Sequence, residues 1–137
     1  MATPNGIRAL SFELPMLSEP MRARLVAYVE GFKAGDFDAV RAMLADDVRL
    51  DLVATLQRRG KGEVGEYYGA YNAAREKWAF AAGAVDGRAA MLVYDREVSL
   101  DAPAYFVVLD FDGGRVSRIR DFLYARYAME CATVHVV

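Results

Sequence analysis

Asp121 is the residue whose type and position best suit acid–base chemistry. It lies between Arg120 and Phe122 in the C-terminal part of the chain. A shielded carboxyl group can accept or donate a proton, and an arginine–aspartate pair can anchor a polar ligand. Arg118, two residues before Arg120, shares a face with it in a strand. The sequence favours a plainer role for Asp121, at a bend of the strand and ion-paired with a neighbour.

The chain contains few residues that could support other kinds of catalysis, such as nucleophilic or metal-dependent catalysis. Cys131 is the only cysteine and His135 the only histidine. A single cysteine forms no internal disulfide, which fits a reducing, cytoplasmic location. A Ser-His-Asp or Cys-His site would depend on His135 near the chain end, where residues are often mobile. There is no glycine-rich phosphate-binding motif and no cluster of metal-ligand residues, so we expect neither metal nor cofactor.

The aromatic residues are numerous enough to suggest a binding pocket. They can form a core in which each tyrosine hydroxyl finds a hydrogen bond, or line a pocket for a flat, apolar small molecule. Pocket walls are also core, so both interpretations can hold. The sequence weighs them evenly for Tyr28 and Trp78 and favours plain core positions for Phe80 and Tyr94. The remaining aromatics of this set are Phe32, Tyr67, Tyr68, Tyr71 and Tyr105.

Composition describes one small globular domain. The chain has 137 residues, of which 55% are hydrophobic and 26% charged, with a formal net charge of -2. This suits a packed core and argues against a nucleic-acid partner, which would require a basic stripe. The densest basic cluster is Arg58, Arg59 and Lys61, expected in a solvated loop. No apolar stretch is long enough to span a membrane. We expect a tail or linker over residues 1–17, without a signal peptide, and one domain over 18–137.

Three helices are predicted. Ser18 can cap a first helix with Pro20 in its first turn, ending at Ala34-Gly35. Asp36 can cap a short second helix that runs to Asp46-Asp47. A third helix is expected from about Lys61 to Ala74. The apolar residues at helical spacing in the first helix are Leu25, Tyr28, Val29 and Phe32.

The remaining segments predict strands. Val48, Leu50 and Leu52 alternate with polar residues, and Gln57 to Gly62 is expected as a polar loop. Asp86-Gly87 and Asp112 to Gly114 are turn signals. They separate strands that begin near Trp78, Met91, Tyr105 and Arg115, the last expected to reach about Tyr127 with Asp121 in its middle. The order α-α-β-α-β-β-β-β is that of an α+β protein, with the first and third helices covering the sheet.

Three separated segments resemble the SnoaL-like/NTF2-like superfamily. They are Tyr28-Val29-Glu30-Gly31-Phe32-Lys33-Ala34-Gly35-Asp36, then Leu44-Ala45-Asp46-Asp47-Val48, and Gly114-Arg115-Val116-Ser117-Arg118-Ile119-Arg120-Asp121. The resemblance covers roughly residues 20 to 130. It implies an NTF2-like (cystatin-like) cone with three helices packed on a curved, mostly antiparallel sheet.

A narrower resemblance concerns SnoaL-like C-terminal domains of extracytoplasmic-function RNA polymerase sigma factors. The segments similar to that group are 65–71, 85–89, 103–110, 119–122 and 125–127. This resemblance implies a regulatory role in transcription. Nothing in this chain corresponds to the sigma regions that bind polymerase and promoter.

The superfamily also contains ketosteroid isomerases and polyketide cyclases. By resemblance, Tyr28 occupies the position of an isomerase tyrosine, whereas the position of the base is Leu52. Asp51 is one residue away and therefore on the opposite face of a strand. The strand at Tyr105 offers no second acid. The isomerase set is incomplete, and a cyclase-type reaction would depend on Asp121.

The sheet face away from the helices is predicted to be apolar. Ile119, Leu123 and alternate residues of the Tyr105 strand would lie on it. Because exposed apolar faces mark interfaces, we expect a homodimer through this face.

The leading interpretation is a ligand-binding or regulatory domain for an apolar or aromatic small molecule. One alternative is a cyclase- or isomerase-like enzyme that uses Asp121 and Tyr28, and another is a dimerisation module. The predicted ligand-binding residues are Tyr28, Phe32, Leu52, Tyr68, Trp78, Tyr105 and Arg120.

Overall fold

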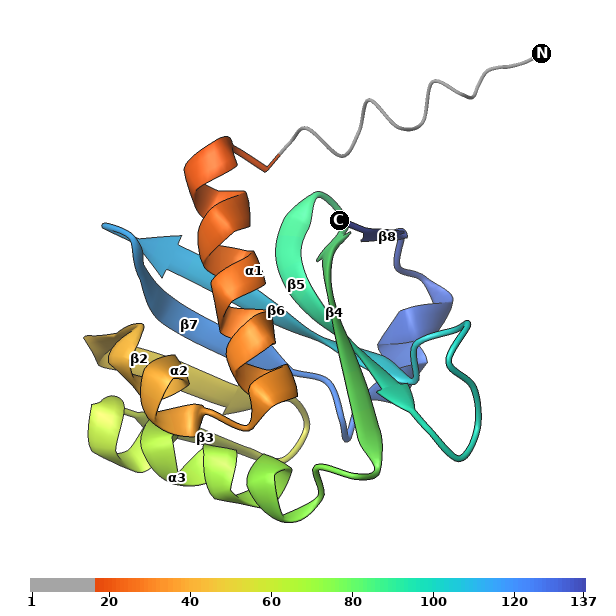
Figure 1. Ribbon diagram of the computed structural model, residues 1–137, viewed down its shortest axis with the longest axis horizontal. Coiled ribbons are helices and arrows are strands. Elements are labelled where there is room, and N and C mark those ends of the chain that lie inside the picture. Colours follow the sequence, from red (N-terminus) through yellow and green to blue (C-terminus); the bar gives the residue numbers. More distant parts are fainter. Residues whose placement is uncertain (1–16) are drawn as a thin grey trace.

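A computed structural model describes residues 17–137 and shows helices packed against a curved sheet (Figure 1). The helices are α1 (Glu19–Ala34), α2 (Phe37–Ala42) and α3 (Lys61–Ala73). Together with the sheet they form the predicted α+β cone. None of these helices is long and apolar enough to cross a membrane.

Capping residues fix both ends of α1 as the sequence predicts. The Ser18 hydroxyl accepts a hydrogen bond from the Met21 N–H, and Gly35 ends the helix in the left-handed region at φ 72°. Tyr28 and Phe32 are on its buried face. Leu17, assigned to the tail from the sequence, is buried in the core, and residues 1–16 of that tail lie outside the described residues.

Helix α2 is shorter than predicted. Asp36 caps it, with its carboxylate accepting from the Ala39 N–H, but the helix ends at Ala42 instead of Asp46-Asp47. Leu44 already belongs to a strand that pairs with Val116. The apolar residues of this segment continue at helical spacing beyond Ala42, but pairing with β7 draws them into a strand instead.

Within the described residues the sheet has seven strands, in the order β3-β2-β7-β6-β5-β4-β8. Only β2 and β7 pair in parallel, and the other neighbours are antiparallel. The predicted turn at Asp86-Gly87 is confirmed, with φ of 50° and 80°. The strands are β2 (Leu44–Leu52), β3 (Leu56–Arg59), β4 (Trp78–Val85), β5 (Arg88–Asp95), β6 (Tyr105–Asp112), β7 (Arg115–Asp121) and β8 (Val134–Val136).

Two short strands were not predicted. The segment expected as a polar loop forms β3, an edge strand whose Gln57 pairs with Asp51 of β2. The last predicted strand stops at Asp121 instead of Tyr127. The chain then turns, forms the 3-10 helix η2 (Arg126–Glu130), and returns as β8, where His135 pairs with Ala84 of β4.

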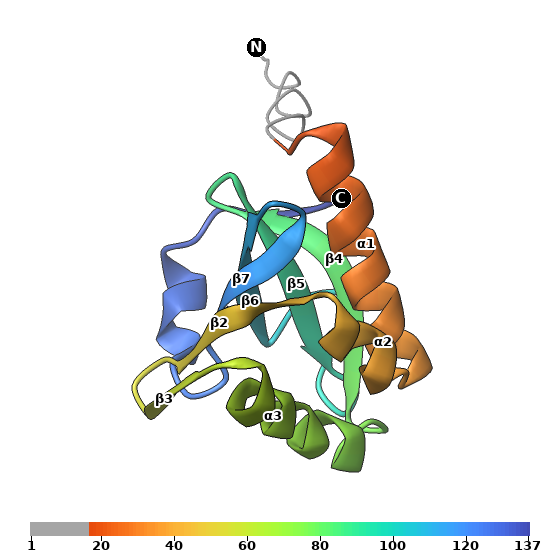
Figure 2. The ribbon, with the colours of Figure 1, turned by 90° about the vertical axis from the view of Figure 1, so that its left-hand side faces the viewer.

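The two faces of the sheet are covered by different elements (Figure 2). The concave face packs on the helices and forms the main core. The other face carries a smaller apolar cluster on β4, β5 and β6, against which Phe122, Met129 and Val134 of the C-terminal segment pack.

The positions predicted for Ile119 and Leu123 are wrong. Ile119 is fully buried in the main core, and Leu123 packs against the same core. The reason is the register. Ile119 lies opposite Leu109 of β6, whose side chain belongs to the concave face. These residues supply no apolar outer face, and the homodimer stays a prediction.

Gly83 of β4 allows β8 to pack. A Cβ at this position would lie 2.5 Å from the His135 carbonyl oxygen and 2.8 Å from the Leu92 side chain. We expect Gly83→Ala to lower the free energy of unfolding by about 1–3 kcal/mol, as overpacking does. Amide exchange of β8 should accelerate.

A matched control is Gly69→Ala in the interior of α3, where a Cβ meets no atom within 4 Å. Alanine should stabilise the helix there by about 0.5–1 kcal/mol. Urea denaturation of both variants measures the effect. Equal stability of Gly83→Ala and the wild type would show that β8 does not depend on this close contact.

Candidate functional site

Asp121 is the last residue of β7, and its side chain points into the concave face. It is fully buried, and it lies opposite Val107 of β6, a core residue. One carboxylate oxygen accepts hydrogen bonds from the hydroxyls of Tyr67, at 2.5 Å, and Tyr71, at 2.6 Å. The other accepts the Leu123 N–H at 2.9 Å. The strand bend predicted here exists, but tyrosine hydroxyls take the place of the expected ion pair.

Arg120 lies on the opposite face from Asp121. It is registered with Val108 of β6 and Asp51 of β2, and its guanidinium approaches the Asp110 carboxylate at 3.8 Å. Successive residues of a strand point to opposite faces. The arginine–aspartate anchor considered from the sequence is therefore not formed by Arg120 and Asp121.

The hydroxyl network continues beyond Asp121. The Tyr71 hydroxyl also hydrogen-bonds that of Tyr105. The hydroxyls of Tyr28 and Tyr68, 2.9 Å apart, form a separate pair in the same core. All of these residues except Tyr67 are buried. The tyrosines thus satisfy one another and the carboxylate within an apolar interior, as buried polar groups require.

The structure brings together most of the residues predicted to bind a ligand. Tyr28, Phe32, Tyr68, Trp78 and Tyr105 all belong to the main core cluster. Leu52, the position of an isomerase base by resemblance, is directly beside Asp121 in the ladder between β2 and β7. A carboxylate is therefore present one strand away from the expected place.

Tyr67 and Tyr71 were absent from the predicted site. Both are in α3, four residues apart, and such residues lie on one helix face. That spacing was a usable signal for a paired hydroxyl site. The partner Asp121, by contrast, is 54 residues from Tyr67 and 50 from Tyr71, so no local pattern links them.

Burial governs the electrostatics of this network. It raises the pKa of Asp121 above the usual range, while hydrogen bonds from Tyr67, Tyr71 and the Leu123 N–H oppose the rise. Burial and then the nearby Asp121 charge raise the pKa of Tyr67 and Tyr71 well above normal. The tyrosines therefore stay protonated at neutral pH, and Asp121 is the group that can titrate.

Aromatic rings fill the cone around the network. Phe32 is central, with its ring centroid 5.2 Å from Tyr28, 5.6 Å from Tyr68 and 5.4 Å from Tyr71. It also touches Phe80, whose ring contacts Tyr71. The contacts of Phe32 with Tyr68, Tyr71 and Phe80 are edge-to-face, a geometry that stabilises the packing beyond the buried area alone.

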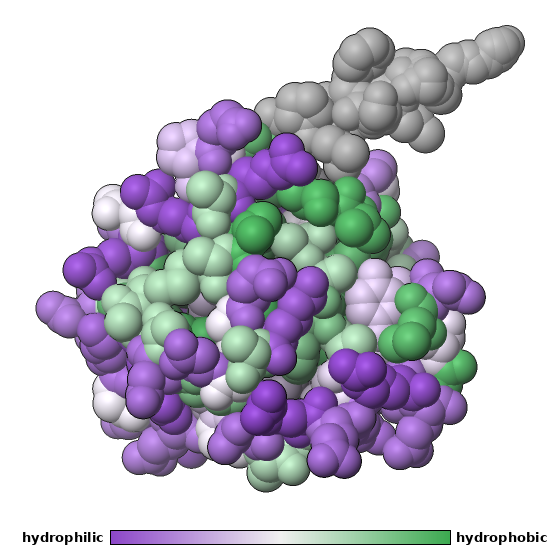
Figure 3. Space-filling view, viewed as in Figure 1, coloured by the Kyte–Doolittle hydropathy of each residue, from purple (hydrophilic) through white to green (hydrophobic). Residues whose placement is uncertain are grey.

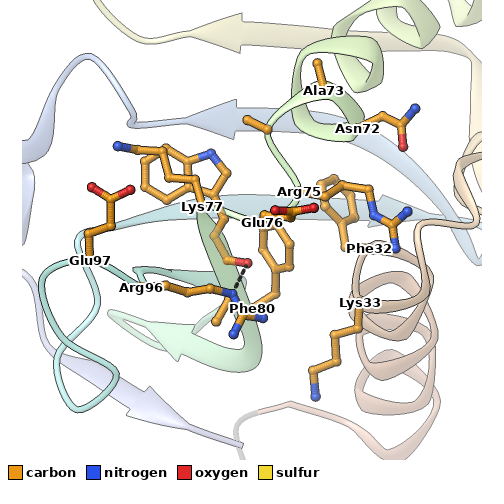
Figure 4. A pocket seen from close by; sticks show the side chains of 13 residues that line it. Phe32, Lys33, Asn72, Ala73, Arg75, Glu76, Lys77, Phe80, Arg96 and Glu97 are labelled. Carbon is orange, nitrogen blue, oxygen red and sulfur yellow. Dashed lines mark hydrogen bonds between the residues drawn. The ribbon is translucent and has the colours of Figure 1, made fainter.

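A surface cleft of about 1300 Å³ reaches these rings from outside (Figure 4). Phe32, Trp78 and Phe80 line it and also belong to the core. The space-filling view shows charged residues around apolar ones on this side of the molecule (Figure 3). The charged residues that line the cleft are Lys33, Arg75, Glu76, Lys77, Arg96 and Glu97.

Two cations flank the indole of Trp78. The Lys77 ammonium is 5.0 Å from its centroid, and the Arg126 guanidinium carbon is 5.9 Å away. Arg126 also lies 5.7 Å from the Tyr105 ring, which meets Trp78 edge-on. Trp78 thus joins the cleft to the tyrosine network.

Metal-ligand residues do not gather in the part of the chain that the structure describes. Residues 17–137 hold no group of three or more histidine, cysteine, aspartate or glutamate side chains that could bind a metal ion. Cys131 is exposed as a free thiol, and His135 lies in β8.

Comparisons of the sequence found no matching protein-family model and no matching curated protein. Solved structures do match. An NTF2-like protein of unknown function from Burkholderia xenovorans is 21% identical, with a TM-score of 0.57, over 77% of this chain and 83% of that one. A candidate ketosteroid isomerase from Kribbella flavida is 20% identical, with a TM-score of 0.53, over 74% and 76%.

A third match is a candidate polyketide cyclase from Pseudomonas putida. It is 22% identical, with a TM-score of 0.50, over 72% of this chain and 87% of that one. At these identities the likeness concerns the fold. The chain has an NTF2-like fold, as the sequence resemblance implied.

The raised pKa of Asp121 predicts how stability depends on pH. The folded protein binds the Asp121 proton more tightly than the unfolded chain, in which the pKa of an aspartate has its ordinary value of 3.8. The contribution of Asp121 to the free energy of unfolding is therefore fully present below pH 3.8. It is lost as the pH rises through the pKa that Asp121 has in the folded protein. The free energy of unfolding of the wild type minus that of Asp121→Asn should increase as pH falls from about 8 to about 4.

Urea denaturation across this pH range measures the difference. Tyr67→Phe removes a hydroxyl that stabilises the carboxylate, so it should raise the pKa of Asp121 further and widen the pH range of the effect. A wild-type minus Asp121→Asn difference that stays constant with pH would mean that Asp121 keeps an ordinary pKa.

Proposed function

We propose that this protein binds a small, flat, mostly apolar molecule that carries a hydroxyl or carbonyl group. The observation that supports the proposal is the contact between cleft and network: Phe80 lines the cleft, and its ring meets Tyr71, which hydrogen-bonds Asp121. An aromatic surface with a few convergent polar groups behind it is typical of small-molecule sites.

The aromatic rings of the cleft would contribute to the binding energy, because burial of apolar surface yields about 25 cal/mol per Å². Phe32, Trp78 and Phe80 are 1%, 6% and 8% exposed, so a flat ring system would reach this surface after the charged side chains at the cleft move aside. Lys77 and Arg126 beside Trp78 favour electron-rich rings or a phenolate oxygen.

The network would supply orientation. Tyr71 divides its hydroxyl between Asp121 and Tyr105, so a ligand oxygen could replace one of these partners after a small side-chain rotation. A buried hydroxyl left without a partner is costly, and this favours ligands with an oxygen over pure hydrocarbons.

Acid–base catalysis is a second proposal, which the position of Asp121 favours. The carboxylate is beside Leu52 on the concave face and has a raised pKa, the property of a general base that works near neutral pH. Two fold neighbours are a candidate ketosteroid isomerase and a candidate polyketide cyclase. Binding ranks first because both Asp121 oxygens already accept hydrogen bonds and the residue is fully buried.

Regulation in a sigma-factor context, self-association as a homodimer and a cytoplasmic location are further proposals. The first is supported by sequence resemblance and the third by the single, unpaired Cys131, whereas Ile119 and Leu123, expected to form the dimer face, belong to the core. A regulatory role is compatible with ligand binding, because a ligand that favours one state of a protein shifts its population.

Trp78, the only tryptophan of the chain, reports on binding. We expect alizarin, a flat hydroxylated anthraquinone, to quench its fluorescence at saturable concentrations. Phe80→Leu should weaken the affinity at least about fivefold, the equivalent of about 1 kcal/mol. The control Tyr94→Phe alters an aromatic residue in the cluster on the other face and should leave the affinity unchanged.

Two results would contradict the binding proposal. One is an absence of saturable quenching up to the solubility of the dye. The other is an equal loss of affinity in Phe80→Leu and Tyr94→Phe, which would place the dye away from the cleft.

The catalytic proposal predicts proton exchange. The protein should accelerate the exchange of the α-protons of 2-tetralone for deuterium in D₂O, followed by NMR, by roughly 10²–10⁴-fold, the usual contribution of a general base. Asp121→Asn should abolish the acceleration, and Asp110→Asn, which alters a carboxylate on the outer face of the sheet, should retain it. Absence of acceleration in the wild type, or its persistence in Asp121→Asn, would contradict the catalytic proposal and leave binding as the remaining one.

A further inference from the structure

Arginines form a row across the outer face of the sheet. Arg59 of β3 is registered with Arg49 of β2, and Arg49 with Arg118 of β7. Registered residues of neighbouring strands have side chains on the same face, about 5 Å apart. The row continues from Arg118 to Asp110 of β6, which forms an ion pair with Arg88 of β5 at 2.7 Å.

This arrangement is unfavourable for the protein by itself. Like charges directly opposite one another on neighbouring strands destabilise a sheet. Asp110 is the only acidic residue in the row, and Arg88 and Arg120 already approach it. Arg49, Arg59 and Arg118 form no ion pair with any residue of the described range 17–137.

Arg120 adds to the positive charge in the next row of the same face. Its Nε is buried and has no hydrogen-bond partner among residues 17–137. Burial, and then the charge of Arg88, lower its pKa, and Asp110 and Asp51 oppose this. The sheet therefore holds an unsatisfied donor beside arginines that lack partners.

A hollow of about 340 Å³ opens at these arginines. Four arginines and two acidic residues line it, so its local charge is positive although the whole chain carries -2. Its full lining is Arg49, Leu50, Asp51, Gln57, Arg58, Arg59, Glu63 and Arg118.

We propose that this hollow, the arginine hollow, binds a compact polyphosphate group such as the di- or triphosphate of a small molecule. Guanidinium groups match phosphate oxygens with two parallel hydrogen bonds. A polyphosphate carries several negative charges and can therefore pair with several arginines at once. The volume suits a small anion and is too small for a folded partner. Bound phosphate would replace repulsion between the arginines with attraction.

The site is separate from the aromatic cleft. None of the residues that line the arginine hollow lines the cleft, and the arginine row lies on the face away from Asp121. The inference therefore does not depend on the proposed binding of an apolar molecule, and the two can fail independently.

Isothermal titration of the full chain with inorganic tripolyphosphate at low ionic strength tests the proposal. We expect saturable binding that tightens from phosphate to pyrophosphate to tripolyphosphate. Arg49→Gln and Arg118→Gln should each weaken it at least about tenfold, whereas Arg22→Gln, the same charge change on exposed α1, should leave it within about twofold.

A second measurement keeps the test meaningful if a variant binds poorly for structural reasons. Without ligand, Arg49→Gln should unfold at an equal or higher temperature than the wild type, since it removes repulsion. Addition of tripolyphosphate should raise the unfolding temperature of the wild type but not of Arg49→Gln.

Three results would overturn the proposal. They are an absence of tripolyphosphate binding at low salt, an equal loss in Arg22→Gln, and affinity for single-stranded oligonucleotides that grows with their length and exceeds that for tripolyphosphate. The last would assign the surface to a nucleic-acid backbone instead of a compact anion.

Discussion

The burial of one carboxylate is the constraint on which the rest of this structure depends. Asp121 is excluded from water, and a buried carboxylate must be hydrogen-bonded or neutralised to be tolerated. Tyr67 and Tyr71 meet that requirement, and in doing so they hold α3 against the end of β7. The third bond, from the Leu123 N–H, turns the chain out of the strand toward η2. One residue therefore couples a helix, a strand end and the C-terminal segment.

The concave and outer faces of the sheet serve different chemistry. The concave face is filled by rings around Phe32, with the polar groups of the tyrosines directed at one another and at Asp121. The outer face is apolar where the C-terminal segment covers it and strongly basic on the uncovered strands β2, β3 and β7. Strand alternation produces this division, because neighbouring residues such as Arg120 and Asp121 must face opposite ways.

The sequence predicted the elements that carry their own signals. The caps at Ser18 and Gly35 and the spacing of Tyr28 and Phe32 specify α1 without reference to the rest of the chain. The edge strands β3 and β8 were missed, because an edge strand such as Leu56–Arg59 pairs through its backbone and needs no alternation of apolar residues.

The face of the sheet on which each side chain of β7 lies was harder to predict than the strand itself. A register shift between Asp110 and Phe111 interrupts the simple alternation on β6, and the predicted strand ran on past its true end at Asp121. Neither feature changes the face of Ile119: it lies two residues from Asp121 in the regular part of the ladder, so both side chains point into the concave face. Aromatic composition pointed to the rings that fill the core, but not to the bonds of Tyr67 and Tyr71 with Asp121, which join distant parts of the chain and could not be inferred from spacing.

The small size of β8 has a consequence for how copies of this chain can meet. Within residues 17–137, the edge of β4 is covered by the three residues of β8 and by the adjacent bond from the Val137 N–H to the Ala82 carbonyl. Release of this short segment would uncover a strand edge with unpaired backbone groups, which accepts any extended peptide of suitable register. In a single molecule, β8 shields this edge of β4. If β8 paired instead with β4 of a second copy, the two copies would exchange strands reciprocally.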